Sequence, residues 1–209
     1  MIILDTSDPE IVSKAALLMR RGDIAVFPTD TVYGLGTIAT KQNNKNVQKI
    51  FKIKKRSLEK PLSVLMTLDM ISQFIEAPGS VINSLREIWP APITFIVDWK
   101  MSGLKKLSPY LNTSGNNTIA CRVPAHDILL SIIRNIEAPI VGTSANTSGH
   151  EPSINFSEVF NDLSTRGVDL WIDQGILPQR SPSTIIDITS PDEPIILRKG
   201  DFKLTNFRS

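Results

Sequence analysis

Two short polar stretches contain the residue types that proteins use to hold anions. Residues 54–56 read Lys-Lys-Arg. An arginine presents a planar set of N–H donors that fits phosphate or carboxylate, and a lysine adds a compact positive charge. Alternate side chains of an extended segment point the same way, so we expect Lys54 and Arg56 to face one pocket. The chemistry that this predicts is the binding and charge neutralisation of a polyanion.

The second stretch, residues 142–149, is rich in hydroxyl and amide groups and follows an apolar segment that is predicted to be a strand. Ligands of α/β proteins gather at the carboxyl ends of strands, where such loops lie. Ser144 and Asn146 share one side of this stretch by the same alternation. The alternative is an ordinary turn, because Gly, Ser, Thr and Asn are the usual turn residues.

Polar residues at three other predicted strands add candidates for the same site. The loop at 29–36 follows a strand and begins Thr-Asp-Thr. Alternation along a strand places Thr118 and Arg122 on one face. Ser183 lies at the start of a strand, and Arg198 follows the apolar residues of another. Buried arginines need anionic partners, so each arginine either binds a ligand or forms a structural salt bridge.

Other common catalytic patterns are absent or lack their context. The histidines are His126 and His150, which are too few and too isolated for histidine acid–base chemistry or a usual zinc site. A Gly-x-Gly-x-x-Ala pattern begins at Gly34, but its surroundings do not fit a dinucleotide-binding turn. The sequence has no Walker phosphate loop and no Gly-x-Ser-x-Gly elbow. What remains is chemistry carried out by cations, hydroxyls and amides.

Length and composition predict one ordinary globular domain that covers residues 1–209. Hydrophobic residues make up 41% and charged residues 21%, values that exclude a disordered chain or a coiled coil. Apolar runs are no longer than strands, no secretory signal is visible, and the one cysteine, Cys121, allows no internal disulfide. These features predict a cytoplasmic protein that does not enter a membrane.

The net charge is only +2, but basic residues are concentrated between residues 41 and 60, where Glu59 is the only acidic residue. Some of these lysines are spaced by three or four residues and share one face of a predicted helix: Lys41, Lys45, Lys49 and Lys52. Such a block attracts phosphate, including the backbone of an RNA. The alternative is a solvated helix face with no binding role.

The spacing of apolar residues predicts an α/β (α+β) fold in which strands and helices are mixed without a strict rhythm. We therefore expect a mixed, twisted sheet with flanking helices rather than a purely parallel one. Ser7 and Glu10 form a predicted capping box for the first helix, and residues 100–117 resemble a mobile connection. Helices are predicted near 44–54, 69–75, 80–89, 126–136 and 156–164, and strands near 2–4, 24–27, 62–66, 93–98, 118–123, 139–142, 169–173, 184–188 and 194–197.

Taken together, eight stretches resemble the YrdC-like family of threonylcarbamoyl-adenylate synthases. The resemblance covers essentially the whole chain, and the stretches occur in the family's order and at its approximate spacing. They are PTDTVYGLG (28–36), KKR (54–56), KPLSVLM (60–66), WPAPITFIV (89–97), TIACRVP (118–124), GTSANTSG (142–149), PSTIID (182–187) and ILRKG (196–200).

The resemblance implies a YrdC-like fold, in which a mixed twisted sheet encloses a positively charged concave cleft. It implies an enzyme that combines L-threonine, bicarbonate and ATP, with Mg²⁺ on the nucleotide, into threonylcarbamoyl-AMP and pyrophosphate. A transferase complex then modifies adenosine 37 of tRNA, so tRNA or double-stranded RNA is a possible partner. A related branch, which resembles YciO, implies the alternative of a non-catalytic RNA-binding or ribosome-maturation module.

The resemblance also implies roles for individual residues, and it implies no metal site built by the protein. The catalytic set, which holds ATP and the carbamate, is Lys54, Arg56, Ser144 and Asn146. Further ATP contacts are expected from Lys60, Thr118, Ser153 and Arg198. The L-threonine contacts are expected from Thr31, Arg122 and Ser183, with Arg122 facing the carboxylate of threonine.

Overall fold

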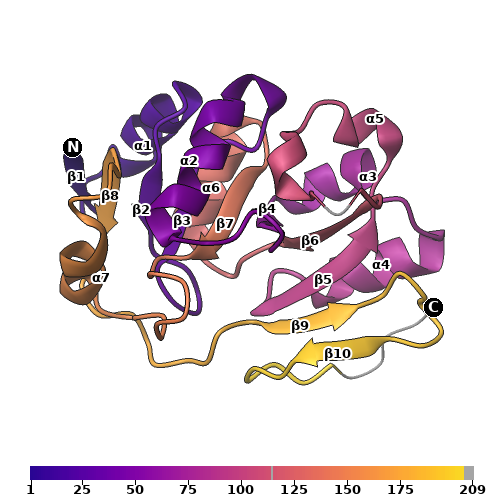
Figure 1. Cartoon of the computed structure of the whole chain (residues 1–209). Coiled ribbons are helices and arrows are strands. Elements are labelled where there is room, and N and C mark those ends of the chain that lie inside the picture. The colour runs from indigo at the N-terminus through magenta and orange to yellow at the C-terminus, as the bar shows by residue number, and fades with distance from the viewer. Residues whose placement is uncertain (114, 205–209) are drawn as a thin grey trace.

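One mixed β-sheet runs through the molecule and carries the helices on its two sides (Figure 1). The computed structural model describes residues 1–113 and 115–204. Within them the strand order is β1-β8-β2-β3-β7-β4-β6-β5-β9-β10, with parallel and antiparallel neighbours, which confirms the predicted mixed sheet. The strands are β1 (Ile2–Asp5), β2 (Ala25–Phe27), β3 (Gly34–Gly36), β4 (Ser63–Leu65), β5 (Ile93–Asp98), β6 (Thr118–Arg122), β7 (Ile140–Ser144), β8 (Leu170–Asp173), β9 (Thr184–Asp187) and β10 (Ile195–Arg198).

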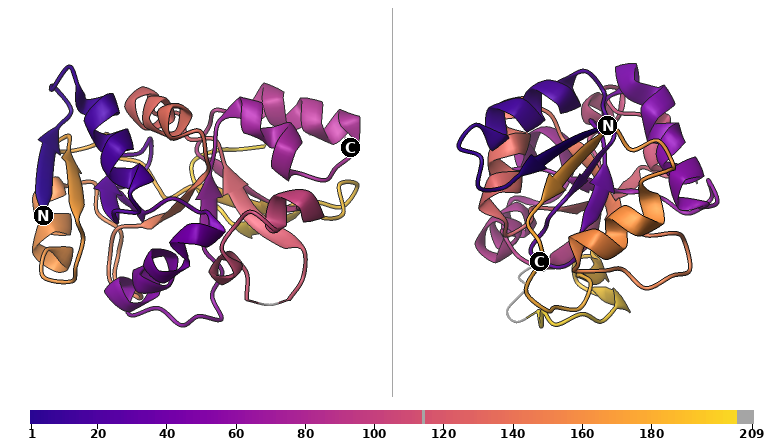
Figure 2. Two further views of the ribbon diagram at one scale, coloured as in Figure 1. Left: turned by 90° about the horizontal axis from the view of Figure 1, so that it is seen from above. Right: turned by 90° about the vertical axis from the view of Figure 1, so that its left-hand side faces the viewer.

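The helices cover both faces of the sheet, and the predicted ones are present. Seen from above, α1 and α6 lie next to each other on one side of the sheet, and α2 lies on the other (Figure 2). The α-helices are α1 (Ile11–Arg20), α2 (Asn44–Lys54), α3 (Ile71–Phe74), α4 (Gly79–Ile88), α5 (Met101–Leu104), α6 (Asp127–Ile136) and α7 (Phe156–Leu163). Short 3₁₀ turns are η1 (Lys41–Asn43), η2 (Leu68–Met70) and η3 (Pro109–Leu111).

Helix α2 forms where the sequence predicts it because its apolar residues recur every three or four positions. Val47, Ile50 and Phe51 are buried, whereas Lys45 and Lys52 are exposed. The buried side chains belong to a hydrophobic cluster that extends along the sheet from β8 to β9. This packing fixes the axis of α2, and therefore the position of the lysine at its end.

The end of α2 differs from the predicted extended segment. Lys54 is the last helical residue, and Lys55 has a left-handed backbone with a φ of 52°. The amide of Arg56 donates to the carbonyl of Phe51 (2.8 Å), and that of Lys55 donates to the carbonyl of Lys52 (3.1 Å). These two bonds form a Schellman motif, which reverses the chain at the helix end. The prediction that Lys54 and Arg56 face one pocket by strand alternation is therefore wrong in its geometry.

The predicted loop at 29–36 is partly a strand, because its end forms β3. This strand lies between β2 and β7 and is antiparallel to both. A side chain at Gly36 would place its Cβ only 1.8 Å from the carbonyl oxygen of Val141. The close approach of the two backbones therefore requires glycine at this position. The pairing brings Gly34 opposite Ser144. The polar segment before β3 and the polar segment after β7 therefore leave the sheet side by side.

The described residues between 100 and 117 contain short helical elements. They include α5 and η3, and the side chains of Leu107 and Leu111 are buried in the core. The amide of Lys41 donates to the carbonyl of Lys106 (2.9 Å), which ties the segment to the turn before α2. Residue 114 lies outside the described residues. The described part of this segment therefore contains regular structure that packs on the core, and its mobility stays a prediction.

The first helix begins later than its predicted capping box. Helix α1 starts at Ile11, with Glu10 in the N-cap position and no side-chain cap. Instead, the amide of Ser7 donates to Asp5 Oδ1 (2.7 Å), and that of Glu10 donates to Asp8 Oδ1 (2.8 Å). Two aspartate turns thus take the place of the predicted Ser7–Glu10 box.

In the part of the chain that the structure describes, every helix is too short or too polar to cross a bilayer.

Candidate active site

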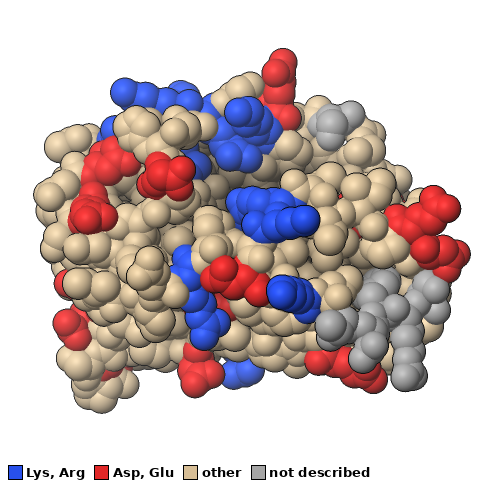
Figure 3. Space-filling model, turned by 90° about the horizontal axis from the view of Figure 1, so that it is seen from below, with Lys and Arg blue, Asp and Glu red and all other residues tan. Residues whose placement is uncertain are grey.

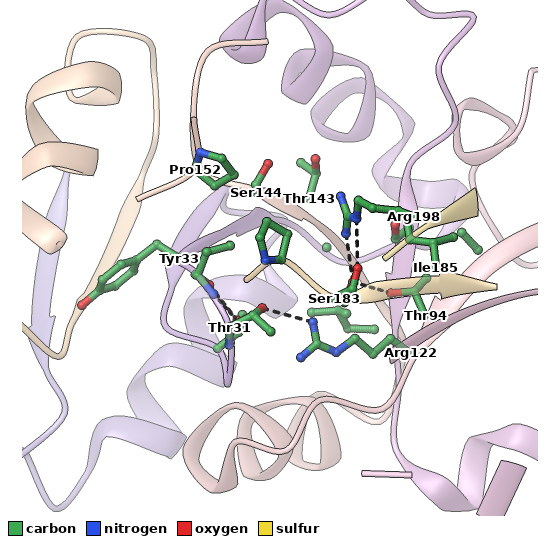
Figure 4. A pocket seen from close by; sticks show the side chains of 18 of the residues that line it. Thr31, Tyr33, Thr94, Arg122, Thr143, Ser144, Pro152, Ser183, Ile185 and Arg198 are labelled. Carbon is green, nitrogen blue, oxygen red and sulfur yellow. Dashed lines mark hydrogen bonds between the residues drawn. The ribbon is translucent and has the colours of Figure 1, made fainter. Parts of the chain in front are cut away.

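A cavity of about 350 Å³ lies where loops and strand ends from both halves of the sheet meet (Figure 4). Its walls come from the segment after β2, the ends of β7 and β10, and the inner faces of β5, β6 and β9. The charged residues of its lining are all arginines: Arg56, Arg122 and Arg198. Threonines and serines line it as well: Thr29, Thr31, Ser63, Thr94, Thr143, Ser144 and Ser183.

Arg198 lies at one wall of the cavity and is held by Ser183. Its Nε donates to the carbonyl oxygen of Ser183 (2.9 Å) and its Nη2 donates to Ser183 Oγ (3.1 Å). Ser183 Oγ also shares a hydrogen bond with Thr94 Oγ1 (2.9 Å). Burial, with the nearby charge of Arg122, lowers the pKa of Arg198 from its usual value. Among the described residues Arg198 forms no ion pair, so its charge is available to an anionic ligand.

Arg122 is different, because a carboxylate already compensates its charge. Its Nη2 forms a salt bridge with Asp30 Oδ1, and the two side chains are only 7% and 4% exposed. Its other donors contact the carbonyl of Ala91 (Nε, 3.2 Å) and Thr31 Oγ1 (Nη1, 3.3 Å). Of the two readings of Arg122, the salt bridge is present in this structure. A role in holding a threonine carboxylate stays a prediction.

Lys54 is fully buried and does not line the cavity. Its ammonium donates to the carbonyl oxygens of Ser144 and Asn146 (2.9 Å for Asn146) and to Asn146 Oδ1 (3.3 Å). Burial, with the charge of Arg56, lowers the pKa of Lys54 to about 7. The cationic stretch and the hydroxyl–amide stretch therefore meet, as predicted. Lys54, however, binds the backbone of the loop and does not face the cavity.

Asn146 is likewise occupied within the loop. Its Nδ2 donates to the carbonyl oxygens of Thr147 (3.0 Å) and His150 (2.6 Å), and its Oδ1 accepts from Lys54. Only Ser144 of the serine–asparagine pair lines the cavity. Asn146 therefore shapes the loop that presents Ser144.

Arg56 reaches the cavity from the chain reversal after α2. Its Nε and Nη2 donate to the carbonyl oxygens of Lys60 (3.1 Å) and Pro61 (2.8 Å), which hold the guanidinium in place. Burial lowers the pKa of Arg56 from its usual value. Lys60 takes part here through its backbone, and its side chain is exposed.

The predicted residues thus fall into two groups. The structure places Thr31, Arg56, Arg122, Ser144, Ser183 and Arg198 around one cavity, and it places Lys54, Lys60, Thr118, Asn146 and Ser153 outside the lining. Thr118 follows the same face of β6 as Arg122, but its hydroxyl donates to Asn116 Oδ1 (3.1 Å). Ser153 Oγ donates to Glu158 Oε2 (2.5 Å).

Two residues of the site have no role assigned by sequence reasoning. Asp30 pairs with Arg122, and its Oδ2 is buried with no partner among the described residues. The sequence feature that could have indicated Asp30 is its position between Thr29 and Thr31, at the start of the polar segment 29–36. Thr94 binds Ser183 across β5 and β9. Its signal is a lone hydroxyl in the apolar run that forms β5.

The face seen from below carries several groups of Lys and Arg side chains across its middle, with an acidic group among them (Figure 3). A second hollow, of about 660 Å³, lies between η1, α3, residues 105–107 and the end of α6. Basic and acidic residues line it together: Lys41, Asp69, Lys105, Lys106, Arg134 and Glu137. Of these two cavities, only the first has charged lining residues that are all cationic.

The chain is similar in sequence to known proteins. Residues 17–200 match the sequence model of the Sua5/YciO/YrdC family, which is described as "Telomere recombination", and the chain belongs to this family. It is 35% identical over 201 residues to the threonylcarbamoyl-AMP synthase of Bacillus subtilis, and 33% identical over 194 residues to that of Pyrococcus abyssi. These matches cover 94% and 91% of this chain but 55% and 54% of those proteins, so the chain spans about half the length of these relatives.

Solved structures agree on the fold. The structure of P. abyssi Sua5 complexed with L-threonine matches with a TM-score of 0.83 and 30% identity, over 96% of this chain and 58% of that one. E. coli YciO matches with a TM-score of 0.82 over 99% of this chain and 97% of that one. At 24% identity, the second match shows the shared fold alone.

Proposed function

We propose that this chain is a threonylcarbamoyl-AMP synthase that acts on L-threonine, bicarbonate and ATP. The observation that carries the proposal is the cavity that Arg56 and Arg198, neither in an ion pair among the described residues, line together with Ser144. The names of the relatives support the same reaction. We further propose that residues 1–209 act as one domain, and that the reaction takes place in the cytoplasm.

The reaction joins three substrates in two steps. The amine of threonine and bicarbonate form a carbamate and release water. A carbamate oxygen then attacks the α-phosphorus of ATP, the bond to the bridging oxygen breaks, and pyrophosphate leaves. Such a transfer depends on positioning and on neutralising spread negative charge rather than on a histidine base. Arg56 and Arg198 supply that charge in this proposal, and the Ser144 hydroxyl and nearby amides position the phosphate.

The threonine end of the site is proposed to include Thr31, Arg122 and Ser183. These residues lie on one side of the cavity and are joined through Arg122 to Asp30 and through Ser183 to Thr94. The carboxylate of Asp30 balances the charge of Arg122, so the pair carries no net charge although Arg122 keeps its N–H donors. A zwitterion fits such a wall because its carboxylate needs donors and its amine needs acceptors.

Magnesium is proposed to arrive with ATP. The cavity lining includes no carboxylate, and no group of three metal-ligating side chains occurs among the described residues. Magnesium prefers phosphate oxygens, water and few protein ligands. The chain's own contribution is therefore expected to be the cationic wall, with the ion bound through the triphosphate.

The product is proposed to pass to a tRNA-modifying threonylcarbamoyl-transferase complex. RNA binding is a separate proposal, favoured by the exposed lysines Lys45 and Lys52 on α2. An RNA-binding module without catalysis is the second candidate function. Retention of tRNA at physiological salt with no ATP turnover would favour that module over the enzyme.

The test is release of pyrophosphate by the purified protein. With ATP, Mg²⁺ and bicarbonate present, release is expected with L-threonine and to be much slower with L-serine. Threonylcarbamoyl-AMP should appear in equal amount to pyrophosphate by mass spectrometry. Equal release with serine, or no release with any amino acid, would overturn the proposed reaction.

A further inference from the structure

The loop that presents Ser144 is anchored by a residue of α7 that lies outside the cavity lining. Asp162 Oδ2 accepts from the amide of Thr147 (2.8 Å), and Asp162 Oδ1 accepts from Thr147 Oγ1 (2.8 Å). Thr147 is only 7% exposed. One carboxylate therefore fixes both the backbone and the side chain of the residue after Asn146.

The same carboxylate is linked to the end of α2. Arg166, one turn further along the chain, donates from Nη2 to Asp162 Oδ1 (2.9 Å) and from Nη1 to the carbonyl of Ile53 (3.2 Å). The amide of Ser148 donates to the carbonyl of Lys54 (2.7 Å). The loop and the helix end are thus joined directly, by this bond and by the bonds of the Lys54 ammonium, and also through Asp162 and Arg166.

Charge connects Asp162 to Lys54 as well. The charge of Asp162 raises the pKa of Lys54, against burial and against the charge of Arg56, which both lower it. Burial opposes ionisation of Asp162 itself, but hydrogen bonds from Thr147 and the charges of Arg166 and His150 lower its pKa overall. The charged and titratable groups that act on Lys54 and Asp162 are therefore Arg56, Arg166, His150 and the two residues themselves.

We propose that Asp162 is a positioning residue of this site, which holds residues 144–148 over the Lys54 ammonium and, through Arg166, locks that loop to the end of α2. Its effect on the reaction rests on the proposed function, but its effect on Lys54 and on the loop does not. It acts through Lys54 and Ser144 and contacts no substrate.

The kinetic test compares Asp162→Asn with Asn161→Ala. The first keeps the shape of the side chain and removes its charge, and the second alters an exposed neighbour on the same helix. Asp162→Asn is expected to lower kcat about tenfold, the scale of one lost charge-assisted hydrogen bond, with little change in the KM for threonine. Asn161→Ala is expected to leave both constants unchanged. A change in the threonine KM alone would contradict the proposal.

A second readout does not depend on activity. The titration of Lys54 can be followed by NMR of the lysine side chain, with Lys54→Arg used to assign the signal. Asp162→Asn should shift this titration to lower pH, whereas Thr147→Val, which removes a hydroxyl but no charge, should leave it in place. Both variants should speed amide exchange at positions 147 and 148.

The outcomes separate the two proposals. If the wild-type protein releases no pyrophosphate but Asp162→Asn shifts the Lys54 titration and loosens the loop, the proposed function fails and the positioning role stands. If Asp162→Asn changes neither the titration nor the exchange of the loop amides, the positioning role is wrong, whatever the activity.

Discussion

At the scale of single residues, the three arginines of the cavity have different surroundings. Arg122 is paired with Asp30, whereas Arg56 and Arg198 are held by carbonyl and hydroxyl oxygens that leave their charge uncompensated. Arg56 is half-buried and Arg198 is exposed, so an anionic ligand can reach both charges. This contrast makes Arg56 and Arg198 the residues on which anion binding should depend most.

We therefore predict that Arg56→Ala and Arg198→Ala each lower kcat/KM for ATP by roughly tenfold to a hundredfold. The estimate corresponds to one charge-assisted contact of about 1.5–3 kcal/mol. The control is Arg86→Ala, which removes an exposed arginine of α4 outside the cavity lining. Steady-state pyrophosphate release measures the effect, and two variants with wild-type constants would disprove the assigned site.

Lys54 gives a pH-dependent prediction. Burial and the charge of Arg56 lower its pKa to about 7, so the folded state loses this proton before the unfolded state does. The unfolded state then binds more protons above neutral pH, and the free energy of unfolding should rise with pH from about 7. Below about pH 7 both states are protonated and the cost of burying the charge is fully present.

The measurement is urea unfolding at several pH values up to about 8, below the usual cysteine pKa of about 8.5. The limit matters because burial raises the pKa of the Cys121 thiol. At higher pH the unfolded state therefore loses this proton first, which lowers the free energy of unfolding. Lys54→Met should lose the rise. An equal rise in wild type and variant would show that Lys54 is not its source.

At the scale of elements, the sequence predicts most helices and strands because their apolar periodicity is strong. It misses β3 because three residues that read Gly-Leu-Gly carry almost no side-chain pattern, and the strand is set by pairing with β2 and β7. It misses α5 and η3 because both are too short to show a periodic apolar pattern, although Leu107 and Leu111 in this segment are buried. The chain reversal at Lys55 was also missed, since lysine gives no signal for a left-handed backbone.

That reversal gives a stability prediction. Lys55→Gly should stabilise the fold by about 0.5–1 kcal/mol, because glycine avoids the strain of a left-handed residue and loses only part of that gain in chain entropy. Lys52→Gly, in the last turn of the same helix, should destabilise it by up to about 1 kcal/mol. Urea unfolding of both variants measures the difference. The same sign for both would show that the φ of 52° at Lys55 is not strained.

At the scale of the whole molecule, the cavity is built from segments that are far apart in the chain. Thr31, Arg56, Ser144 and Arg198 come from four different parts of the sequence and meet only because β7 joins the two halves of the sheet. Local sequence patterns indicate which residue types are present. That these residues meet at one cavity is implied by the family resemblance. The supporting roles of Asp30 and Asp162 depend on side-chain packing and could not be predicted either way.

Because both halves of the sheet contribute to the cavity lining, the binding of a ligand there should stabilise the entire fold. A ligand at a hundred times its Kd contributes about 2.7 kcal/mol, and each kcal/mol raises the Tm of a protein of this size by about 2–4 °C. We predict that Mg–ATP raises the Tm by roughly 5–10 °C on this scale, and that Arg198→Ala loses most of the shift. A shift with tRNA but none with ATP would instead favour the RNA-binding module, because a polyanion held on the outer lysines does not need the cationic wall of the cavity.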